Sequence, residues 1–204
     1  MAANAPQALL FDLGGVLIDI DFRRAFAAWG EAAAAPAAGL AERFVFDAAY
    51  HAYERGEIGE TEYFASLRAL LGISISDDEF LEGWNAIFVG ARPGVDAMLA
   101  RLAESWPLYV FSNTSRAHKL YFQARYSALL APVREVFCSC DIGLRKPTLE
   151  AYSDVCRRVG VPPGRVAFFD DLDENVRGAR NAGLRAFHVR ADEGTPQVLE
   201  RSLW

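Results

Sequence analysis

The chain alternates short apolar runs with longer stretches in which apolar residues recur at helical spacing. The strand candidates cover residues 9–11, 108–111, 133–139, 166–169 and 186–189. Short runs of this kind are typical of strands that are buried in a parallel sheet. Because helical stretches separate them, the pattern predicts an α/β fold with a doubly wound, Rossmann-like parallel sheet.

One long segment breaks this alternation because it contains no strand candidate. Between residues 22 and 89, aromatic and apolar residues recur at helical spacing, beginning with Phe22, Phe26 and Trp29. We therefore expect a small all-helical cap domain over residues 22–89, inserted into a core domain formed by residues 1–21 and 90–204. If the insert joins the core only near Asp21 and residues 89–91, it can move as a lid.

Local signals predict where several helices begin and end. Thr61 can cap one helix and Gly72 can stop it. The stretch Ser76–Glu79 fits a capping box, and the helix that follows is expected to run as far as Phe88. Pro93 is well placed in the first turn of the next helix.

Polar residues follow four of the strand candidates, where the chain leaves the predicted sheet. They are Asp12, Ser112-Asn113-Thr114, Lys146-Pro147 and Asp170-Asp171. Each has a plainer interpretation when taken singly, because these residue types also cap helices, form turns or lie solvated on the surface. Ligands of open α/β sheets bind beyond the carboxyl ends of the strands, so the four together predict one site.

These residue types suit the binding and transfer of a phosphoryl group. Asp12 could attack phosphorus, and Ser112-Asn113 could bind phosphate oxygens. Lys146 could neutralise both the phosphate and the Asp12 carboxylate. The Asp170-Asp171 pair adds hard carboxylate oxygens, which together with Asp12 would suit Mg²⁺.

Composition and charge narrow the range of partners. The 204 residues carry a formal net charge of −6 and contain no run of Lys or Arg, which argues against nucleic acid and anionic membrane as partners. No apolar stretch approaches the roughly 18 residues of a spanning helix, and the first residues lack a signal-peptide pattern. We expect a cytoplasmic protein, a monomer or weak homodimer, that binds a small phosphorylated metabolite.

The cysteines and histidines predict no further site. Cys138, Cys140 and Cys156 are too few for a disulfide framework or a zinc site, and we expect buried thiols. The histidines have no partner pattern and are interpreted as ordinary: His51, His118 and His188.

The order of the strand-end motifs resembles the haloacid dehalogenase superfamily, in its phosphatase-like branch, over the whole chain. The stretches that carry the resemblance are Phe11–Val16, Ser112-Asn113, Arg145–Pro147 and Phe169–Asp171 followed by Asn175. The resemblance implies Mg²⁺ as the cofactor, Asp12 as the nucleophile that forms an aspartyl-phosphate, and Lys146 as a second catalytic residue. It implies phosphate binding by Gly14, Ser112, Asn113 and Lys146. The implied metal ligands are Asp12, the Gly14 backbone carbonyl and Asp171, supported by Asp170 and Asn175.

Detail in the insert resembles bacterial α-D-glucose-1-phosphate phosphatases. The resemblance lies in Glu54–Ile58 and Phe88–Pro93. It implies a sugar phosphate as substrate, and Tyr50, Tyr53 and Arg55 are the candidate contacts from the cap.

One position departs from the pattern of most phosphatases in the superfamily. They carry a second aspartate two residues after the nucleophile as general acid and base, and here that residue is Gly14. The sugar-1-phosphatase group that the chain resembles also lacks it, so the departure does not imply inactivity. We predict a Mg²⁺-dependent phosphomonoester hydrolase. The alternatives are a 2-haloacid dehalogenase-type hydrolase, which uses no metal, and a non-catalytic phosphometabolite-binding protein.

Overall fold

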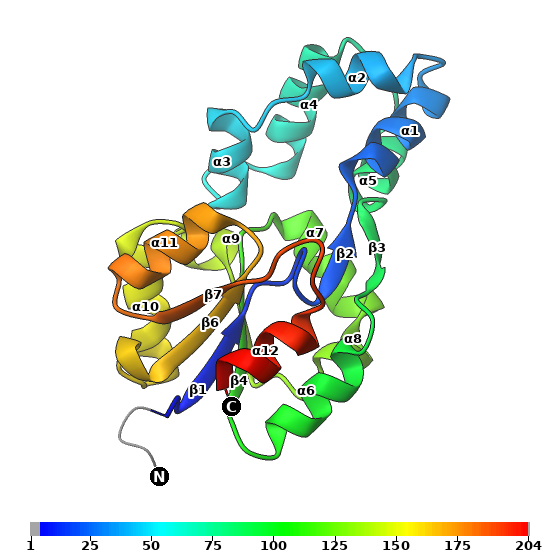
Figure 1. Cartoon of the computed structure of the whole chain (residues 1–204). Coiled ribbons are helices and arrows are strands. Elements are labelled where there is room, and N and C mark those ends of the chain that lie inside the picture. The colour runs from blue at the N-terminus through cyan, green and yellow to red at the C-terminus, as the bar shows by residue number, and fades with distance from the viewer. Residues whose placement is uncertain (1–4, 204) are drawn as a thin grey trace.

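The computed structural model describes residues 5–203 and has a five-stranded parallel sheet at its centre (Figure 1). The strand order is β5-β4-β1-β6-β7, so β1 is central and the chain winds outward from it in both directions. The predicted doubly wound sheet is confirmed. The strands are β1 Ala8–Phe11, β4 Leu108–Ser112, β5 Glu135–Cys138, β6 Val166–Asp170 and β7 Arg185–His188.

Alternate residues of the central strand face two separate layers of helices. Leu9 and Phe11 pack in the same cluster as apolar residues of α6 and α12, whereas Leu10 packs with residues of α10 and α11. All three side chains are fully buried, which explains why the run has no polar alternation. The helices of this core are α6 Val95–Ala103, α7 Arg116–Arg125, α8 Ser127–Leu130, α9 Ser139–Ile142, α10 Leu149–Val159, the short 3₁₀ helix η1 Pro163–Arg165, α11 Asp173–Asn181 and α12 Thr195–Leu203.

Five helices lie between β2 (Ile18–Ile20) and β3 (Phe88–Ala91), which pair as an antiparallel ribbon. Figure 1 shows these helices standing apart from the sheet at the end of the ribbon. They are α1 Phe22–Ala32, α2 Ala37–Arg43, α3 Ala48–Glu54, α4 Glu60–Leu71 and α5 Asp77–Asn85. We refer to α1–α5 as the cap.

The predicted end of the helical insert is wrong in detail. Helix α5 ends at Asn85, and Phe88 already belongs to β3, so the expected boundary at residue 89 falls inside a strand. The apolar residues of this stretch continue the helical pattern by chance. Their strand conformation depends on pairing with β2, far away in the chain, and local periodicity does not report such a partner.

The local helix signals were right in two cases and wrong in two. Gly72 ends α4 in the left-handed conformation at φ 66°, and Ser76 forms the predicted capping box. Helix α4, however, begins one residue before Thr61 and has a glycine as N-cap. Pro93 lies before α6 and not in its first turn, because Gly94, at φ 75°, is the N-cap.

The cap has its own aromatic core. Trp29 stacks on Phe80 with ring centroids 4.6 Å apart, and its indole N–H donates to the Phe80 carbonyl at 2.9 Å. Tyr53 stacks on Tyr63 at 4.5 Å and is only 2% exposed. Each such aromatic pair adds about 0.5–1.5 kcal/mol beyond the burial of its area. The aromatic residues that recur at helical spacing in this segment therefore pack against one another inside the cap.

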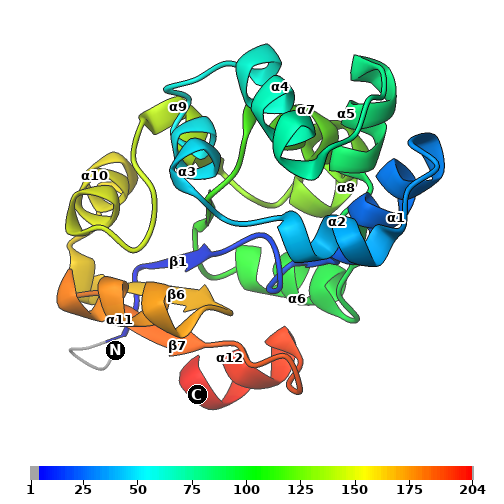
Figure 2. The ribbon, with the colours of Figure 1, turned by 90° about the horizontal axis from the view of Figure 1, so that it is seen from above.

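The cap is also tied to the core at two places beyond the ribbon, which corrects the expectation that it joins the core only there. In Figure 2, α5 lies beside α7 and α3 beside α9. At the first contact, the Trp84 indole N–H donates to Ser115 Oγ at 3.3 Å, and His118 Nε2 lies 2.8 Å from the Trp84 carbonyl. At the second, Ser139 Oγ donates to the Glu54 carbonyl at 2.6 Å. A free lid motion would have to break these buried hydrogen bonds.

Ser139→Ala is expected to destabilise the protein by about 1–3 kcal/mol, because it orphans buried backbone groups. The hydroxyl accepts from the Thr114 amide at 2.8 Å and donates to the Glu54 carbonyl, and the serine is fully buried. Urea unfolding measures the loss, with Ser153→Ala on the exposed face of α10 as the matched control. Equal stability of the two variants would show that Ser139 does not hold the cap.

Two further observations concern membranes and thiols. None of the helices among residues 5–203 combines the length and the apolar character that a membrane crossing needs.

Cys138 and Cys156 are buried free thiols as predicted, whereas Cys140 is half-buried.

Candidate active site

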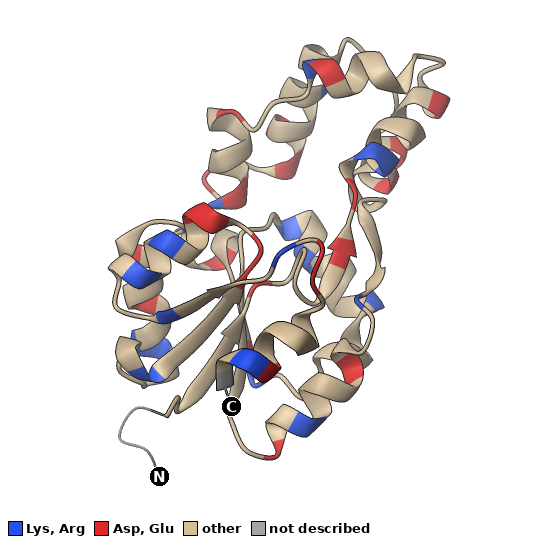
Figure 3. Cartoon of the chain, in the orientation of Figure 1, with Lys and Arg blue, Asp and Glu red and all other residues tan. Residues whose placement is uncertain are grey.

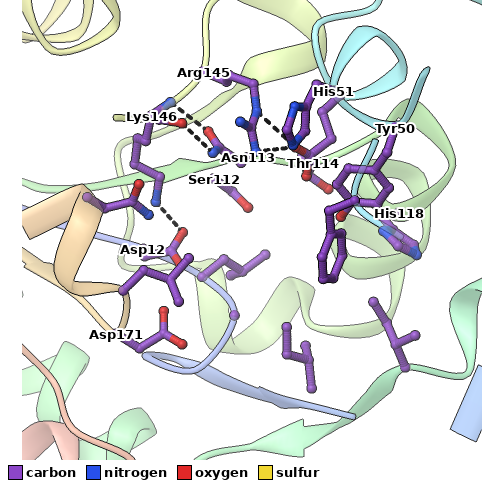
Figure 4. A pocket seen from close by; sticks show the side chains of 18 of the residues that line it. Asp12, Tyr50, His51, Ser112, Asn113, Thr114, His118, Arg145, Lys146 and Asp171 are labelled. Atoms are coloured by element: carbon purple, nitrogen blue, oxygen red, sulfur yellow. Dashed lines mark hydrogen bonds and ion pairs between the residues drawn. The ribbon is translucent and has the colours of Figure 1, made fainter. Parts of the chain in front are cut away.

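The predicted site residues meet where neighbouring parallel strands end. Asp12 follows β1, and its amide donates to the Phe169 carbonyl at 2.8 Å, which fixes it beside the end of β6. Ser112 ends β4 on the other side of β1, and Asp170 ends β6. Figure 4 shows Asp12, Ser112 and Asp171 around one space. The strand order thus brings together motifs that lie far apart in the sequence.

Lys146 is the charged centre of this group. Its ammonium lies 2.7 Å from Asp12 Oδ1 and 2.7 Å from Asp170 Oδ2, and the side chain is 1% exposed. Burial alone would lower the pKa of this lysine, but the two carboxylates outweigh burial and raise it. Lys146 therefore stays protonated and holds Asp12 in place.

The side chain of Asn113 holds the backbone of Lys146. Its side-chain oxygen accepts from the Lys146 amide at 2.9 Å, and its side-chain nitrogen donates to the Lys146 carbonyl at 2.9 Å. Both ends of the amide are thus used to hold the lysine backbone, and Figure 4 shows this pair of bonds. Asn113 thus positions Lys146, while Ser112 lines the pocket beside Asp12.

The three carboxylates form a cluster that fits a divalent cation. One oxygen from each of Asp12, Asp170 and Asp171 lies within 4.8 Å of the others. Burial raises the pKa of Asp12 to about 7, with Lys146 opposing the rise and the other two carboxylates adding to it. Burial and the neighbouring Asp170 also raise the pKa of Asp171 to about 6. Negative charge is thus concentrated here beyond what one lysine offsets, and hard oxygen donors are the ligands that Mg²⁺ prefers.

The two acidic residues at the end of β6 have different surroundings. Asp170 is fully buried and accepts from Lys146, from Asn175 Nδ2 at 3.0 Å and from the Leu172 amide at 2.8 Å. Asp171 has no ion-pair partner within the described chain and lines the pocket beside Asp12. Asp171 is therefore the carboxylate that remains available to a metal, and Asn175 supports Asp170.

The two glycines after Asp12 allow this close packing. Gly15 has φ 70°, and a Cβ built there would lie 2.3 Å from Asp171 Oδ2, so no other residue fits without moving the acid. Gly14 is outside the left-handed region, and its Cβ would meet only the Ile20 side chain, at 3.0 Å from Cδ1. Gly15 is required by geometry, whereas position 14 could accept a small side chain.

A pocket of about 480 Å³ lies between this cluster and the cap. Asp12, Ser112, Lys146 and Asp171 line its inner end. Many of the side chains that line the rest are apolar or aromatic, and they come from the ribbon, the cap and the core: Ile20, Phe22, Phe46, Tyr50, Ile87, Phe88 and Leu172. Clefts of this size bind small molecules.

Of the three predicted cap contacts, only Tyr50 lines this pocket. Tyr53 is turned into the aromatic core of the cap, and Arg55 lies past the end of α3 in an ion pair with Glu57 at 2.6 Å. These two predictions are corrected by the direction of α3. Residues four apart on a helix share a face, so Tyr50 and Glu54 face the pocket together.

Several lining residues escaped the sequence interpretation. The pocket is also lined by His51, Glu54, Arg145 and Glu174, although the sequence gives the histidine no partner pattern. The only feature of the sequence that points to Arg145 is its position directly before Lys146. Spacing from Tyr50 along α3 could have identified Glu54.

His118 also lines the pocket, but its contacts hold the cap against the core. Its ring stacks on Trp84 at 4.6 Å, and Nε2 lies 2.8 Å from the Trp84 carbonyl. Burial lowers the pKa of His118 to about 4, so the ring is neutral at pH 7 and its Nε2 donates to that carbonyl.

Comparison with known proteins agrees with this geometry. The family model of the haloacid dehalogenase-like hydrolases matches residues 6–183. A D-ribitol-5-phosphate phosphatase of Bacteroides thetaiotaomicron is 26% identical over 186 residues, which cover 88% of this chain and 89% of the relative. A haloacid dehalogenase family enzyme of the same bacterium, solved as a magnesium complex, is 25% identical with a TM-score of 0.82, covering 93% of this chain and 96% of that one.

A third similar protein shares the fold at lower identity. It is a hydrolase of Porphyromonas gingivalis described as haloacid dehalogenase-like, with a TM-score of 0.82 and 21% identity over 98% of both chains. The family model covers most of the sequence, including every strand-end motif. The chain belongs to the haloacid dehalogenase-like hydrolases.

Proposed function

We propose that the protein is a Mg²⁺-dependent phosphomonoester hydrolase that acts on a small phosphorylated metabolite through an aspartyl-phosphate on Asp12. The observation that carries the proposal is the buried Lys146, which bridges Asp12 and Asp170, while Asp171 beside them has no ion-pair partner among residues 5–203. The similar D-ribitol-5-phosphate phosphatase and the similar magnesium complex support the reaction and the metal.

In this mechanism each residue has a separate task. Asp12 attacks phosphorus with one carboxylate oxygen as the bond from phosphorus to the leaving oxygen breaks, which leaves an aspartyl-phosphate. Water then hydrolyses this intermediate, so that phosphate is released, Asp12 is regenerated and the protons of the water end on the alcohol and the phosphate. Lys146 offsets negative charge on the transferring phosphoryl group, and the Ser112 hydroxyl donates to one of its oxygens. Mg²⁺, when bound, supplies further stabilisation of that charge. Asp12, Asp171 and the Gly14 carbonyl would hold the ion, with Asp170 and Asn175 in support.

The substrate that we favour is a sugar or polyol phosphate. The similarity to a D-ribitol-5-phosphate phosphatase supports this class, and the sequence resemblance to α-D-glucose-1-phosphate phosphatases suggests a sugar 1-phosphate within it. The division into core and cap supports it too, because the pocket encloses the part of a substrate that lies beyond the phosphate. A cytoplasmic location and a monomeric or weakly dimeric state stay predictions from the sequence.

Phosphate release from a panel of sugar and polyol phosphates, with Mg²⁺ or with a chelator, tests the proposal. We expect turnover that requires the metal. A 2-haloacid dehalogenase would release halide without metal, and a binding protein would be stabilised by ligands without turnover. The acidic cluster argues against the first of these alternatives because a metal-free site has no use for it.

Gly14→Asp is expected to raise the turnover of a sugar 6-phosphate more than that of the sugar 1-phosphate. A positioned general acid typically contributes about 10²–10⁴-fold, and it matters most for a poorly acidic leaving alcohol. The anomeric alcohol that leaves from a 1-phosphate is more acidic than a primary one. The position tolerates a side chain because only the flexible Ile20 must shift.

Gly14→Asn is the matched control, because it adds the same bulk without an acid. Phosphate release from the two esters by both variants gives the comparison. A folded Gly14→Asp protein that gains no more on the 6-phosphate than Gly14→Asn would indicate that another group already supplies the proton.

A further inference from the structure

The part of the pocket away from Asp12 and Asp171 offers few cationic side chains. Of the described residues that line it, only Arg145 and Lys146 carry cationic side chains at neutral pH, and both are already paired. Lys146 belongs to the phosphate end. Arg145 lies among the residues that would surround the rest of the substrate, and Glu54 takes up its charge.

The Glu54–Arg145 ion pair is a built contact between cap and core. Arg145 Nε donates to Glu54 Oε2 at 3.0 Å, and a terminal guanidinium nitrogen lies 2.8 Å from the same oxygen. The side chain of Glu54 is 6% exposed and that of Arg145 is 20% exposed. Burial raises the pKa of Glu54, and the guanidinium opposes that rise. Figure 4 shows Arg145 directed toward α3, away from Asp12.

The two histidines of the pocket do not replace this cation. Burial holds the pKa of His118 at about 4, and burial together with Arg145 and Arg55 lowers the pKa of His51. Both rings are therefore neutral at pH 7, so they can hydrogen-bond a hydroxyl but cannot neutralise an anion.

Carboxylates outnumber cations around the pocket. Asp12, Glu54, Asp171 and Glu174 line it, and Asp170 lies behind Lys146. Figure 3 shows acidic segments on α3 and at the start of α11, and Glu54 and Glu174 from these two segments line the pocket. A divalent ion at the phosphate end would offset two of these charges, and the substrate phosphate would bring new ones. A second anionic group on the substrate would therefore meet no unpaired cation among the described residues that line the pocket.

We propose that the pocket selects phosphomonoesters whose alcohol part carries no negative charge, and that Glu54 sets this selection by withholding the Arg145 guanidinium from the substrate. The inference rests on the proposed phosphatase function and names its substrate class. Neutral sugars and polyols fit this pocket. Their hydroxyls can hydrogen-bond with His51, Glu54 and Arg145, and their C–H groups can pack against the aromatic side chains that line the pocket. Phosphorylated sugar acids and bisphosphates are rejected, because burying an anion without a partner is costly.

Matched pairs of esters test the selection. α-D-Glucose 1-phosphate is compared with α-D-glucuronic acid 1-phosphate, and D-ribitol 5-phosphate with D-ribonic acid 5-phosphate, so that each pair differs by one carboxylate. We expect kcat/KM for the neutral member to be higher by about 100-fold or more in at least one pair. Comparable values for the two members of both pairs would overturn the proposal.

A binding measurement separates failure of this proposal from failure of the proposed function. If neither these esters nor p-nitrophenyl phosphate releases phosphate, the phosphatase function fails. In that case, the rise in unfolding temperature that each ester causes in the presence of Mg²⁺ still measures whether the protein binds the neutral member of a pair more tightly. A larger rise with the neutral member supports charge selection, and equal rises, including none with either member, contradict it.

Glu54→Gln tests the assignment of the residue. The amide keeps the shape and frees the guanidinium, so the preference for the neutral member should fall by about tenfold or more. Glu174→Gln removes one negative charge from the same pocket without freeing a cation, and it should change the preference less. An unchanged preference in Glu54→Gln, or an equal change in both variants, would show that the ion pair does not set the selection.

Arg145→Gln is the second variant, which keeps the assignment testable if Glu54→Gln fails to fold. It leaves the Glu54 carboxylate without its partner, so α-D-glucosamine 1-phosphate, with its ammonium group, should gain relative to α-D-glucose 1-phosphate. No relative gain would contradict a role of Glu54 in reading charge.

Discussion

Replacing Asp12 with asparagine is expected to lower phosphate release by several orders of magnitude while leaving ligand binding intact. The amide has the shape of the carboxylate and can still accept from Lys146, but it lacks the charge that attacks phosphorus. Steady-state turnover and the affinity for inorganic phosphate with Mg²⁺ are the measurements. If the variant retained more than about a tenth of the activity, the covalent role of Asp12 would be untenable.

The same variant has a stability control that follows from its charge. Burial and two neighbouring carboxylates raise the pKa of Asp12 to about 7, so its ionised form is disfavoured in the folded protein without metal. Removing that charge should leave the metal-free protein at least as stable as the wild type at pH 8. A lower unfolding temperature would mean that the loss of activity reflects damage to the fold.

Asp171→Ala is expected to weaken Mg²⁺ binding strongly and to leave the fold intact. Asp171 has no ion-pair partner among residues 5–203, so its removal orphans no buried group, yet it takes one hard oxygen donor from a small cluster. Metal titration by calorimetry and urea unfolding without metal together measure the two effects. Equal titration curves for the variant and the wild type would remove Asp171 from the metal site.

Asp170→Ala is the informative comparison, because the effects should be reversed. It leaves the buried ammonium of Lys146 with one carboxylate and strips Asn175 of its acceptor, which should cost about 3–5 kcal/mol of stability. Metal affinity should fall less than in Asp171→Ala. If Asp170→Ala weakened the metal more, the assignment within the pair would have to be exchanged.

The sheet could be predicted from sequence because burial on both faces leaves a local trace. A strand such as β1 is apolar at every position, and the helices around it keep their own period. The ribbon is different. Phe88 and Val89 are apolar residues after a helix, and their conformation is fixed by partners in β2 that no local pattern reveals. Contacts between cap and core, such as Ser139 with Glu54, depend on side-chain directions that follow only from the packed structure.

The inner end of the site was predictable for a related reason. Ser112 and Asp170 end their strands and Asp12 directly follows β1, so the sheet topology alone brings them together. The part of the pocket that would surround the rest of the substrate could not be predicted, because its lining depends on which face of α3 is turned toward the core. Tyr53 and Arg55 are close to Glu54 in sequence but point elsewhere. The ion pair of Glu54 with Arg145 joins a residue of the cap to a residue of the core that lies far away in the sequence.

The tie between α3 and the core has a consequence for protein engineering. Exchanging caps among relatives is a natural way to alter substrate range, and β2 and β3 look like convenient points to cut. The Glu54 carbonyl and carboxylate, however, are held by Ser139 and Arg145, which lie outside any such graft. A chimera made at the ribbon would set a foreign helix end against Ser139 and would leave Arg145 without its partner wherever the new helix lacks an acid at this position. A transferable cap therefore includes positions 139 and 145, although they lie far beyond the cap in the sequence.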